Sequence, residues 1–242
     1  TGFPREEAAE LYARLGYEDK LLDTGEIFHF WGIEGPEYIA EELPFEKAGL
    51  NVIFTDDVGS YKKRKVRILN GAHTALVPAA LLCGKKTVGE SVADDKLNAY
   101  VRRALYDEVI PPLDLPKEDL LSFAGAVFDR FANPYIHHRL IDIALNTTSK
   151  WRARILPSVE AYLEQNQSLP KALTFSFAAT LEMFDTFSPK IKDSDDINAL
   201  WEELKLRLPG FEDRVTLYRD RIRTRGCEYA LRRLYEDDPD TP

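Results

Sequence analysis

The segment KVRILNGAHTALVPAAL, residues 65–81, constrains this chain most, because polar side chains interrupt an otherwise apolar helical pattern. Apolar residues recur three or four positions apart, which predicts a helix with one packed stripe. The apolar members of this stripe are Val66, Leu69, Leu76 and Ala80. His73 occupies the remaining position within the stripe. At about 100° per residue, Lys65 and Asn70 fall on its two sides.

A histidine in a packed stripe has two interpretations. Burying a polar group without a partner costs about 1–3 kcal/mol, so His73 could be a hydrogen-bonded core residue, with Lys65 reaching solvent. Alternatively, the helix forms one wall of an active site, with Lys65 as the acid/base. Asn70 and His73 would then hydrogen-bond to a carbonyl or hydroxyl oxygen. Gly71 favours the second interpretation, since a glycine inside a helix suggests close approach by another segment or a ligand.

Composition excludes several classes of partner. The net charge of −9 disfavours nucleic acid and anionic membrane as the main partner. No apolar run reaches the roughly 18–20 residues that a membrane-spanning helix requires. Cys83 and Cys227 are the only cysteines and lack metal-binding spacing, which indicates a reducing compartment such as the cytoplasm.

The pattern along the chain predicts a mainly α fold. Residues 1–60 mix a helix with β-forming segments at 25–33 and 50–58. Two strands alone make a poor sheet, so we expect them to belong to a sheet whose other strands lie outside this chain. Residues 61–242 form a multi-helical domain. Its first helix is predicted to be capped by Ser60 and interrupted at Pro78, a second helix starts near Asp94, and residues 135–146 are also predicted to be helical.

The segment KVRILNGAHTALVP resembles the signature helix of the long-chain polyol dehydrogenases, the mannitol dehydrogenase family, with its pattern K-x-x-x-x-N-x-x-H. Lys65, Asn70 and His73 match that pattern. Residues 130–158 resemble the family's second block, an R-F-x-N-P stretch with a lysine 17 residues after the asparagine. The resemblance covers nearly the whole chain. Its details, including LDLP and NPYIHH, are most similar to members that act on sugar acids.

The resemblance implies an NAD-dependent oxidoreductase that acts on a CH–OH group. Family members begin with a Rossmann domain that binds the cofactor, and this chain has no G-x-G-x-x-G sequence. Residues 1–60 would be a remnant of that domain, and residues 61–242 the C-terminal substrate and catalytic domain. Lys65 would act as general acid/base, with Asn70 and His73 holding the reacting oxygen. This chain alone is expected to be inactive, because its partner, the Rossmann domain, is missing.

The resemblance also suggests how the substrate is bound. Lys150 matches the family's substrate-contacting lysine, although without the resemblance the residue is better interpreted as a surface lysine. Polyol-specific members carry an arginine eight residues earlier, where this chain has Asp142. A hexuronate substrate needs a cation for its carboxylate. The candidates by sequence proximity are His138, Arg152 and Arg154. Arg130 and Asn133 bind substrate in one interpretation and end a helix ahead of Pro134 in the other.

A metal site is not predicted. A zinc site needs three or four ligands, and the adjacent pair His137 and His138 would point in two directions on a helix. We therefore expect a metal-independent mechanism. Two alternatives remain: another substrate of the same family, such as mannitol or a different hexuronate, and a non-enzymatic helical interaction module.

Overall fold

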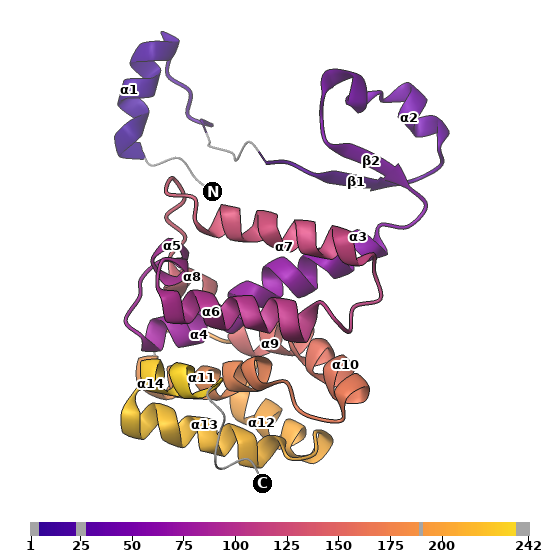
Figure 1. Ribbon diagram of the computed structural model, residues 1–242. Coiled ribbons are helices and arrows are strands. Elements are labelled where there is room, and N and C mark those ends of the chain that lie inside the picture. Colours follow the sequence, from indigo (N-terminus) through magenta and orange to yellow (C-terminus); the bar gives the residue numbers. More distant parts are fainter. Residues whose placement is uncertain (1–4, 23–27, 189–190, 236–242) are drawn as a thin grey trace. The chain divides into compact units, whose positions relative to one another are not determined.

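The structure, a computed structural model, describes residues 5–22, 28–188 and 191–235 (Figure 1). The chain divides into two compact units, residues 1–59 and residues 60–242. Most described residues are helical, so the predicted mainly α class is confirmed. None of the helices in the described ranges is long and apolar enough to span a bilayer.

The first unit contains a two-stranded parallel sheet. Trp31 of one strand lies opposite Val52 of the other, and Glu34 lies opposite Thr55. Parallel strands need a crossover connection, which α2 and η1 provide. The strand predicted at residues 25–33 begins at Trp31, while residues 23–27 lie outside the described part of the chain. The elements are α1 (Arg5–Leu15), β1 (Trp31–Glu34), α2 (Tyr38–Glu42), the 3₁₀-helix η1 (Phe45–Ala48) and β2 (Val52–Thr55).

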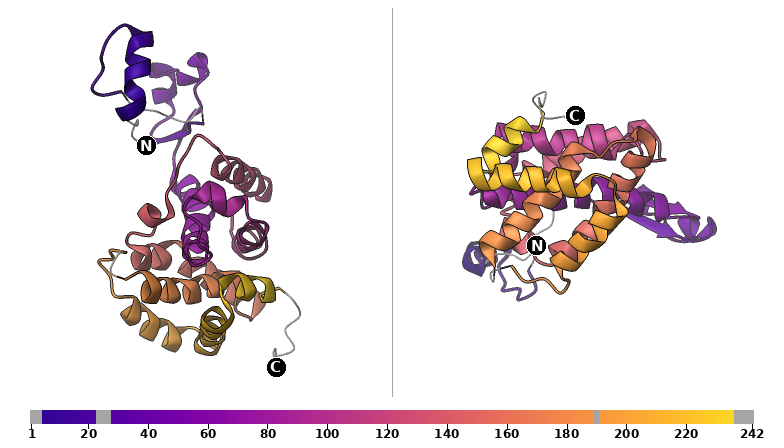
Figure 2. Two further views of the ribbon diagram at one scale, coloured as in Figure 1. Left: turned by 90° about the vertical axis from the view of Figure 1, so that its left-hand side faces the viewer. Right: turned by 90° about the horizontal axis from the view of Figure 1, so that it is seen from below.

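The second unit is a bundle of helices seen from three directions in Figures 1 and 2. Two of its elements, η2 and η3, are π-helical turns. The elements are α3 (Gly59–Arg64), η2 (Lys65–Asn70), α4 (Gly71–Leu82), α5 (Val88–Val92), α6 (Asp95–Arg103), η3 (Ala104–Val109), α7 (Lys117–Phe131), α8 (Leu140–Ile143), α9 (Thr147–Arg154), α10 (Leu156–Asn166), α11 (Lys171–Phe187), α12 (Ile197–Arg207), α13 (Phe211–Arg225) and α14 (Cys227–Arg233).

The helix boundaries follow the chemistry of the residues at their ends, and some of them differ from the predicted boundaries. The helix predicted to start near Asp94 is α6, and Asp94 caps it, since its carboxylate accepts hydrogen bonds from two N–H groups of the first turn. The predicted cap at Ser60 is wrong, because the helix already begins at Gly59. The helix predicted over residues 135–146 is limited to α8. Just before it, Arg139 pairs in an isolated β-bridge with Thr87.

Helix α4 lies at the centre of the second unit. Every residue from Gly71 to Leu81 is buried except His73. The prediction of a single packed stripe was therefore too narrow, because α4 contacts α6, α8, α9 and α11 on different sides. Pro78 lies inside the helix without ending it. This central position holds the polar residues at the start of α4 in a rigid frame.

Glu108 of η3 joins two elements of the core. Its buried carboxylate accepts hydrogen bonds from the N–H groups of Ala172 and Leu173, at 2.8 and 2.9 Å. These groups belong to the first turn of α11, where N–H groups lack intrahelical acceptors. Burial raises the pKa of Glu108 from 4.5 to about 7, although the two hydrogen bonds act in the opposite direction.

We expect the free energy of unfolding to depend on the protonation of Glu108. Because its folded pKa lies above its unfolded pKa, its stabilising contribution is complete below pH 4.5 and is lost as pH rises to about 7. The loss amounts to at most about 3 kcal/mol. Urea unfolding of the wild type and of Glu108→Gln at several pH values checks this. Equal pH dependence in the two proteins would show that Glu108 does not titrate there.

Candidate active site

The π-helical turn η2 sets the geometry of the polar helix. In a π-helix the hydrogen bonds run from residue i to i+5, and here the Gly71 N–H bonds to the Val66 carbonyl. Lys65 and Asn70 are the first and last residues of this turn. Asn70 and His73 are three residues apart, and that spacing makes neighbours on an α-helix. Because a π-helix has more residues per turn than an α-helix, the angles of an α-helical wheel do not apply across this turn.

The three side chains differ in burial. Lys65 is exposed in this unit and Asn70 is half-buried. The His73 ring is partly exposed, but its Nε2 atom is fully buried and has no hydrogen-bond partner among the described residues. The interpretation as a satisfied core histidine is therefore not what the structure shows. A buried nitrogen of this kind costs free energy unless a ligand pairs with it.

Four cationic or titratable side chains surround His73. Burial, with smaller contributions from the charges of His138, Arg154, Arg130 and Lys150, lowers the pKa of His73 to about 3. The imidazole is consequently neutral near pH 7. The His138 ring lies edge-on to it at a centroid distance of 5.4 Å. Of the six predicted substrate-binding residues, His138 contacts His73, Arg154 binds the neighbouring Thr74, and the charges of Arg130 and Lys150 act on His73.

Two of these cations, Lys150 and Arg154, lie one turn apart on α9. Lys150 Nζ donates to the Ile143 carbonyl at 2.9 Å, and Arg154 Nη1 donates to Thr74 Oγ1 at 3.3 Å. Burial lowers the pKa of both groups, and the charge of Arg154 also lowers that of Lys150. Within the described residues, neither forms an ion pair with a carboxylate. The charge of Asp193 acts on the pKa of Lys150 in the opposite direction. Two neighbouring, partly desolvated cations that form no ion pair within the described residues favour an anionic ligand.

The other two predicted residues are engaged elsewhere. Arg152 donates to Glu203 of α12 at 2.6 Å on an exposed side of α9. Asn133 Oδ1 accepts from the Tyr135 N–H at 3.0 Å and so forms a turn after α7. The structure does not bring either side chain to the cluster around His73. Asp142, which stands where polyol-specific members carry an arginine, is also exposed. Its carboxylate pairs with Arg139 at 3.7 Å.

Two further residues at this cluster were not predicted. Phe131 packs against His73 with ring centroids 4.3 Å apart, and it belongs to the same R-F-x-N-P stretch as Arg130. Thr74 bridges the site, since its hydroxyl donates to the Asn70 carbonyl at 2.8 Å and accepts from Arg154. The R-F-x-N-P motif could have indicated Phe131. The sequence around Thr74 carries no comparable signal.

The close approach predicted at Gly71 is made by α9. A Cβ atom there would lie 3.6 Å from the Val66 carbonyl oxygen and 3.8 Å from the Arg154 carbonyl oxygen. These are ordinary van der Waals contacts, so the position does not require glycine for space. The start of α4 and the end of α9 therefore pack directly, which fixes Arg154 near Asn70 and His73.

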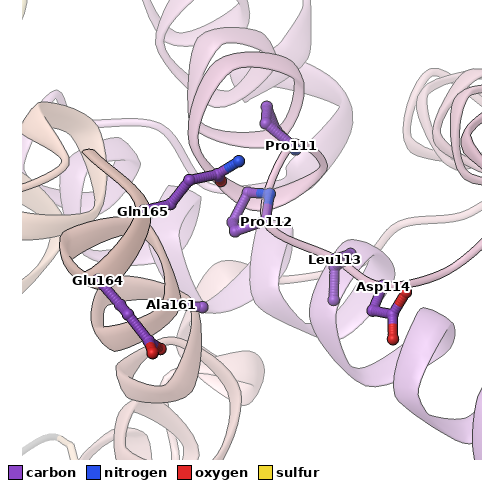
Figure 3. Close-up of a pocket in the computed structure, with 7 residues that line it drawn as sticks. All are labelled: Pro111, Pro112, Leu113, Asp114, Ala161, Glu164 and Gln165. Carbon is purple, nitrogen blue, oxygen red and sulfur yellow. The ribbon is translucent and has the colours of Figure 1, made fainter.

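Two open hollows lie elsewhere on the second unit. One, of about 390 Å³, is formed by the connector after η3 and by α10 (Figure 3). The other, of about 540 Å³, is bordered by the α4–α5 connection, Arg139 and Phe187. Neither is lined by Lys65, Asn70 or His73. Among the described residues, no three His, Cys, Asp or Glu side chains are placed to hold a metal ion together.

Comparison with solved structures defines the class of fold. A D-sorbitol dehydrogenase in substrate-free form matches with a TM-score of 0.79 and 25% identity, covering 96% of this chain and 52% of that one. Pseudomonas fluorescens mannitol 2-dehydrogenase, solved with NAD and D-mannitol, matches with a TM-score of 0.75 and 22% identity, over 97% and 52% of the two chains. The architecture is that of the helical C-terminal part of polyol dehydrogenases.

Sequence comparison shows the family. The model of the mannitol dehydrogenase C-terminal domain matches residues 57–217, and the chain belongs to the mannitol dehydrogenase family. Altronate oxidoreductase of Klebsiella pneumoniae is 42% identical over 266 residues, covering 97% of this chain and 55% of that protein. The Cronobacter sakazakii altronate oxidoreductase is 53% identical over 184 residues, or 76% and 38% of the two chains. The chain thus spans about half, or less, of the length of these relatives.

Proposed function

We propose that this chain is the substrate-binding and catalytic part of an NAD-dependent tagaturonate reductase, also called altronate oxidoreductase. The enzyme would interconvert D-altronate and NAD with D-tagaturonate and NADH. The observation that carries the proposal is the buried, unpartnered Nε2 of His73 beside the cationic cluster. The names of the 42% and 53% identical relatives support the choice of substrate.

In the proposed mechanism Lys65 moves the hydroxyl proton. During oxidation its free amine takes the proton from the substrate hydroxyl, and during reduction its ammonium returns it to the forming alkoxide. Asn70 and neutral His73 hold the same oxygen by hydrogen bonds and stabilise negative charge as it develops there. We propose that the π-helical turn, which begins at Lys65 and ends at Asn70, directs both side chains to that oxygen. Since Lys65 is exposed in the second unit, the proposed site requires further groups to exclude water.

NAD would supply the hydride acceptor when bound. The described residues contain no glycine-rich phosphate-binding turn, so we assign none of them to the dinucleotide. The two parallel strands of the first unit fit a sheet of the cofactor domain, since two strands alone are marginal. We propose that residues 1–60 belong to that domain and that its Rossmann core is the chain's principal protein partner.

Lys150 and Arg154 would bind the substrate carboxylate. Both cations are partly desolvated and without a carboxylate partner in the described chain. The charge of Arg130 acts on His73 from the same region. A neutral polyol offers no charge to this cluster, and the polyol-type arginine is replaced by Asp142. The cluster therefore favours a sugar acid over mannitol as the substrate. The proposed reaction is metal-independent.

The test is a substrate panel on the full-length enzyme. NADH oxidation is measured with tagaturonate, fructuronate, fructose and fructose 6-phosphate. We expect the highest kcat/KM with tagaturonate and a much lower value with fructose, which lacks the carboxylate. A preference for fructuronate would show that the enzyme's substrate is a hexuronate other than tagaturonate. A preference for fructose would refute carboxylate recognition, and turnover of none of the four would favour a non-enzymatic module.

A further inference from the structure

The chain's two cysteines lie together although they are far apart in sequence. Cys83 directly follows α4, and Cys227 is the first residue of α14. The Ala79 carbonyl oxygen accepts a hydrogen bond from the Cys83 N–H at 2.9 Å, and Cys227 Sγ lies 3.5 Å from the same oxygen. One carbonyl oxygen thus contacts both residues and holds Cys83 and Cys227 near each other.

The two thiols differ in access to solvent. Cys83 is half-buried, at the point where the chain leaves α4 through Gly84 in a left-handed conformation (φ 75°). Cys227 is buried, with 5% exposure. A small oxidant can therefore reach the Cys83 thiol before it reaches the buried Cys227 thiol. Neither thiol takes part in the proposed active site, and both are free in the structure.

We propose that Cys83 and Cys227 form an oxidation site that a hydroperoxide converts to an intramolecular disulfide. The Cys83 sulfur attacks the peroxide oxygen, the O–O bond breaks, and Cys83 becomes a sulfenic acid as one water leaves. The Cys227 sulfur then attacks the Cys83 sulfur, the S–O bond breaks, and a second water leaves. In sum, two thiols lose two electrons and two protons, and one hydrogen peroxide becomes two waters.

The disulfide would connect the end of α4 to the start of α14. It would close a loop that runs through almost all of the second unit, and long loops restrict the unfolded chain most. We expect the oxidised protein to unfold at a Tm higher by on the order of 10 °C. Because α4 also carries His73, the cross-link acts on the helix that begins at the active site.

The test treats the full chain with hydrogen peroxide, blocks remaining thiols, and maps the peptides by mass spectrometry without reduction. We expect a Cys83–Cys227 peptide pair, loss of both free thiols, and full reversal by dithiothreitol. Unfolding the chain before treatment should slow the formation of the disulfide, because the two cysteines are then no longer held near each other. Two free thiols after treatment, or cross-links mainly between separate chains, would overturn the proposal.

Two variants assign the roles of the thiols. Cys227→Ser should leave Cys83 trapped as a sulfenic acid that dimedone labels, whereas the wild type should label weakly. Cys83→Ser should remove both the label and the disulfide. Strong labelling of wild-type Cys83, equal to that of Cys227→Ser, would show that Cys227 does not resolve it. The wild-type peptide map decides the proposal even if a variant folds poorly.

Discussion

Replacing Lys65 by alanine in the full-length enzyme is expected to lower kcat by about 10²–10⁴-fold, the usual contribution of a general acid/base. The reason is that the variant loses the amine that we propose as the acceptor and donor of the hydroxyl proton. Steady-state NADH oxidation with tagaturonate measures the effect. Substrate and NADH binding should persist, since the proposed role of Lys65 is proton transfer.

Lys62→Ala provides the matched control. Lys62 is an exposed lysine on α3, one turn before Lys65, and it lies outside the proposed site. Its replacement should leave kcat within about 2-fold, since surface substitutions away from a site have small effects. If both variants lost activity equally, the effect would reflect the general positive charge of this segment. If Lys65→Ala kept near-normal turnover, Lys65 would not be the base.

Replacing Arg154 by methionine is expected to reduce kcat/KM for tagaturonate by roughly 10- to 150-fold, since a hydrogen bond to a charged group contributes about 1.5–3 kcal/mol. Arg154 is half-buried, has no carboxylate partner in the described chain, and lies beside Lys150. Methionine keeps much of the side-chain length and removes the charge. Its effect on the weak turnover of fructose should be small, because fructose carries no carboxylate.

Arg152→Met separates this role from general charge effects. Arg152 is two residues away on α9 and pairs with Glu203 instead. Its loss should change kcat/KM by less than about 3-fold, because exposed ion pairs contribute little. Equal losses in the two variants, or equal losses on tagaturonate and fructose, would contradict the assignment of Arg154 to the carboxylate. Urea unfolding of both variants shows whether either loss comes from the fold.

The helical class could be predicted, because apolar periodicity is a local property. The start of a helix near Asp94 could also be predicted, and α6 begins at Asp95. The π turn could not be predicted, since periodicity assumes 3.6 residues per turn and does not report an inserted residue. The burial of α4 on several sides was also missed, because it depends on helices distant in sequence.

The candidate site was predictable as a set of residues but not as an arrangement. Arg152 and Arg154 were equal candidates by proximity, and only the packing of α9 against α4 and α12 separates them. Asn133 belongs to the same motif as Arg130 but forms a turn. The lack of a partner for His73 Nε2 could not be predicted from sequence, because it depends on every neighbouring side chain.

The most direct measurement is the structure of the full-length enzyme with altronate and NAD bound. The central claim is that Lys65, Asn70 and His73 meet on one substrate oxygen. We predict that Lys65 Nζ and His73 Nε2 each lie about 2.6–3.2 Å from the hydroxyl oxygen to be oxidised, with the Asn70 amide also in contact. A hydroxyl held by other residues, with Lys65 directed into solvent, would contradict the claim.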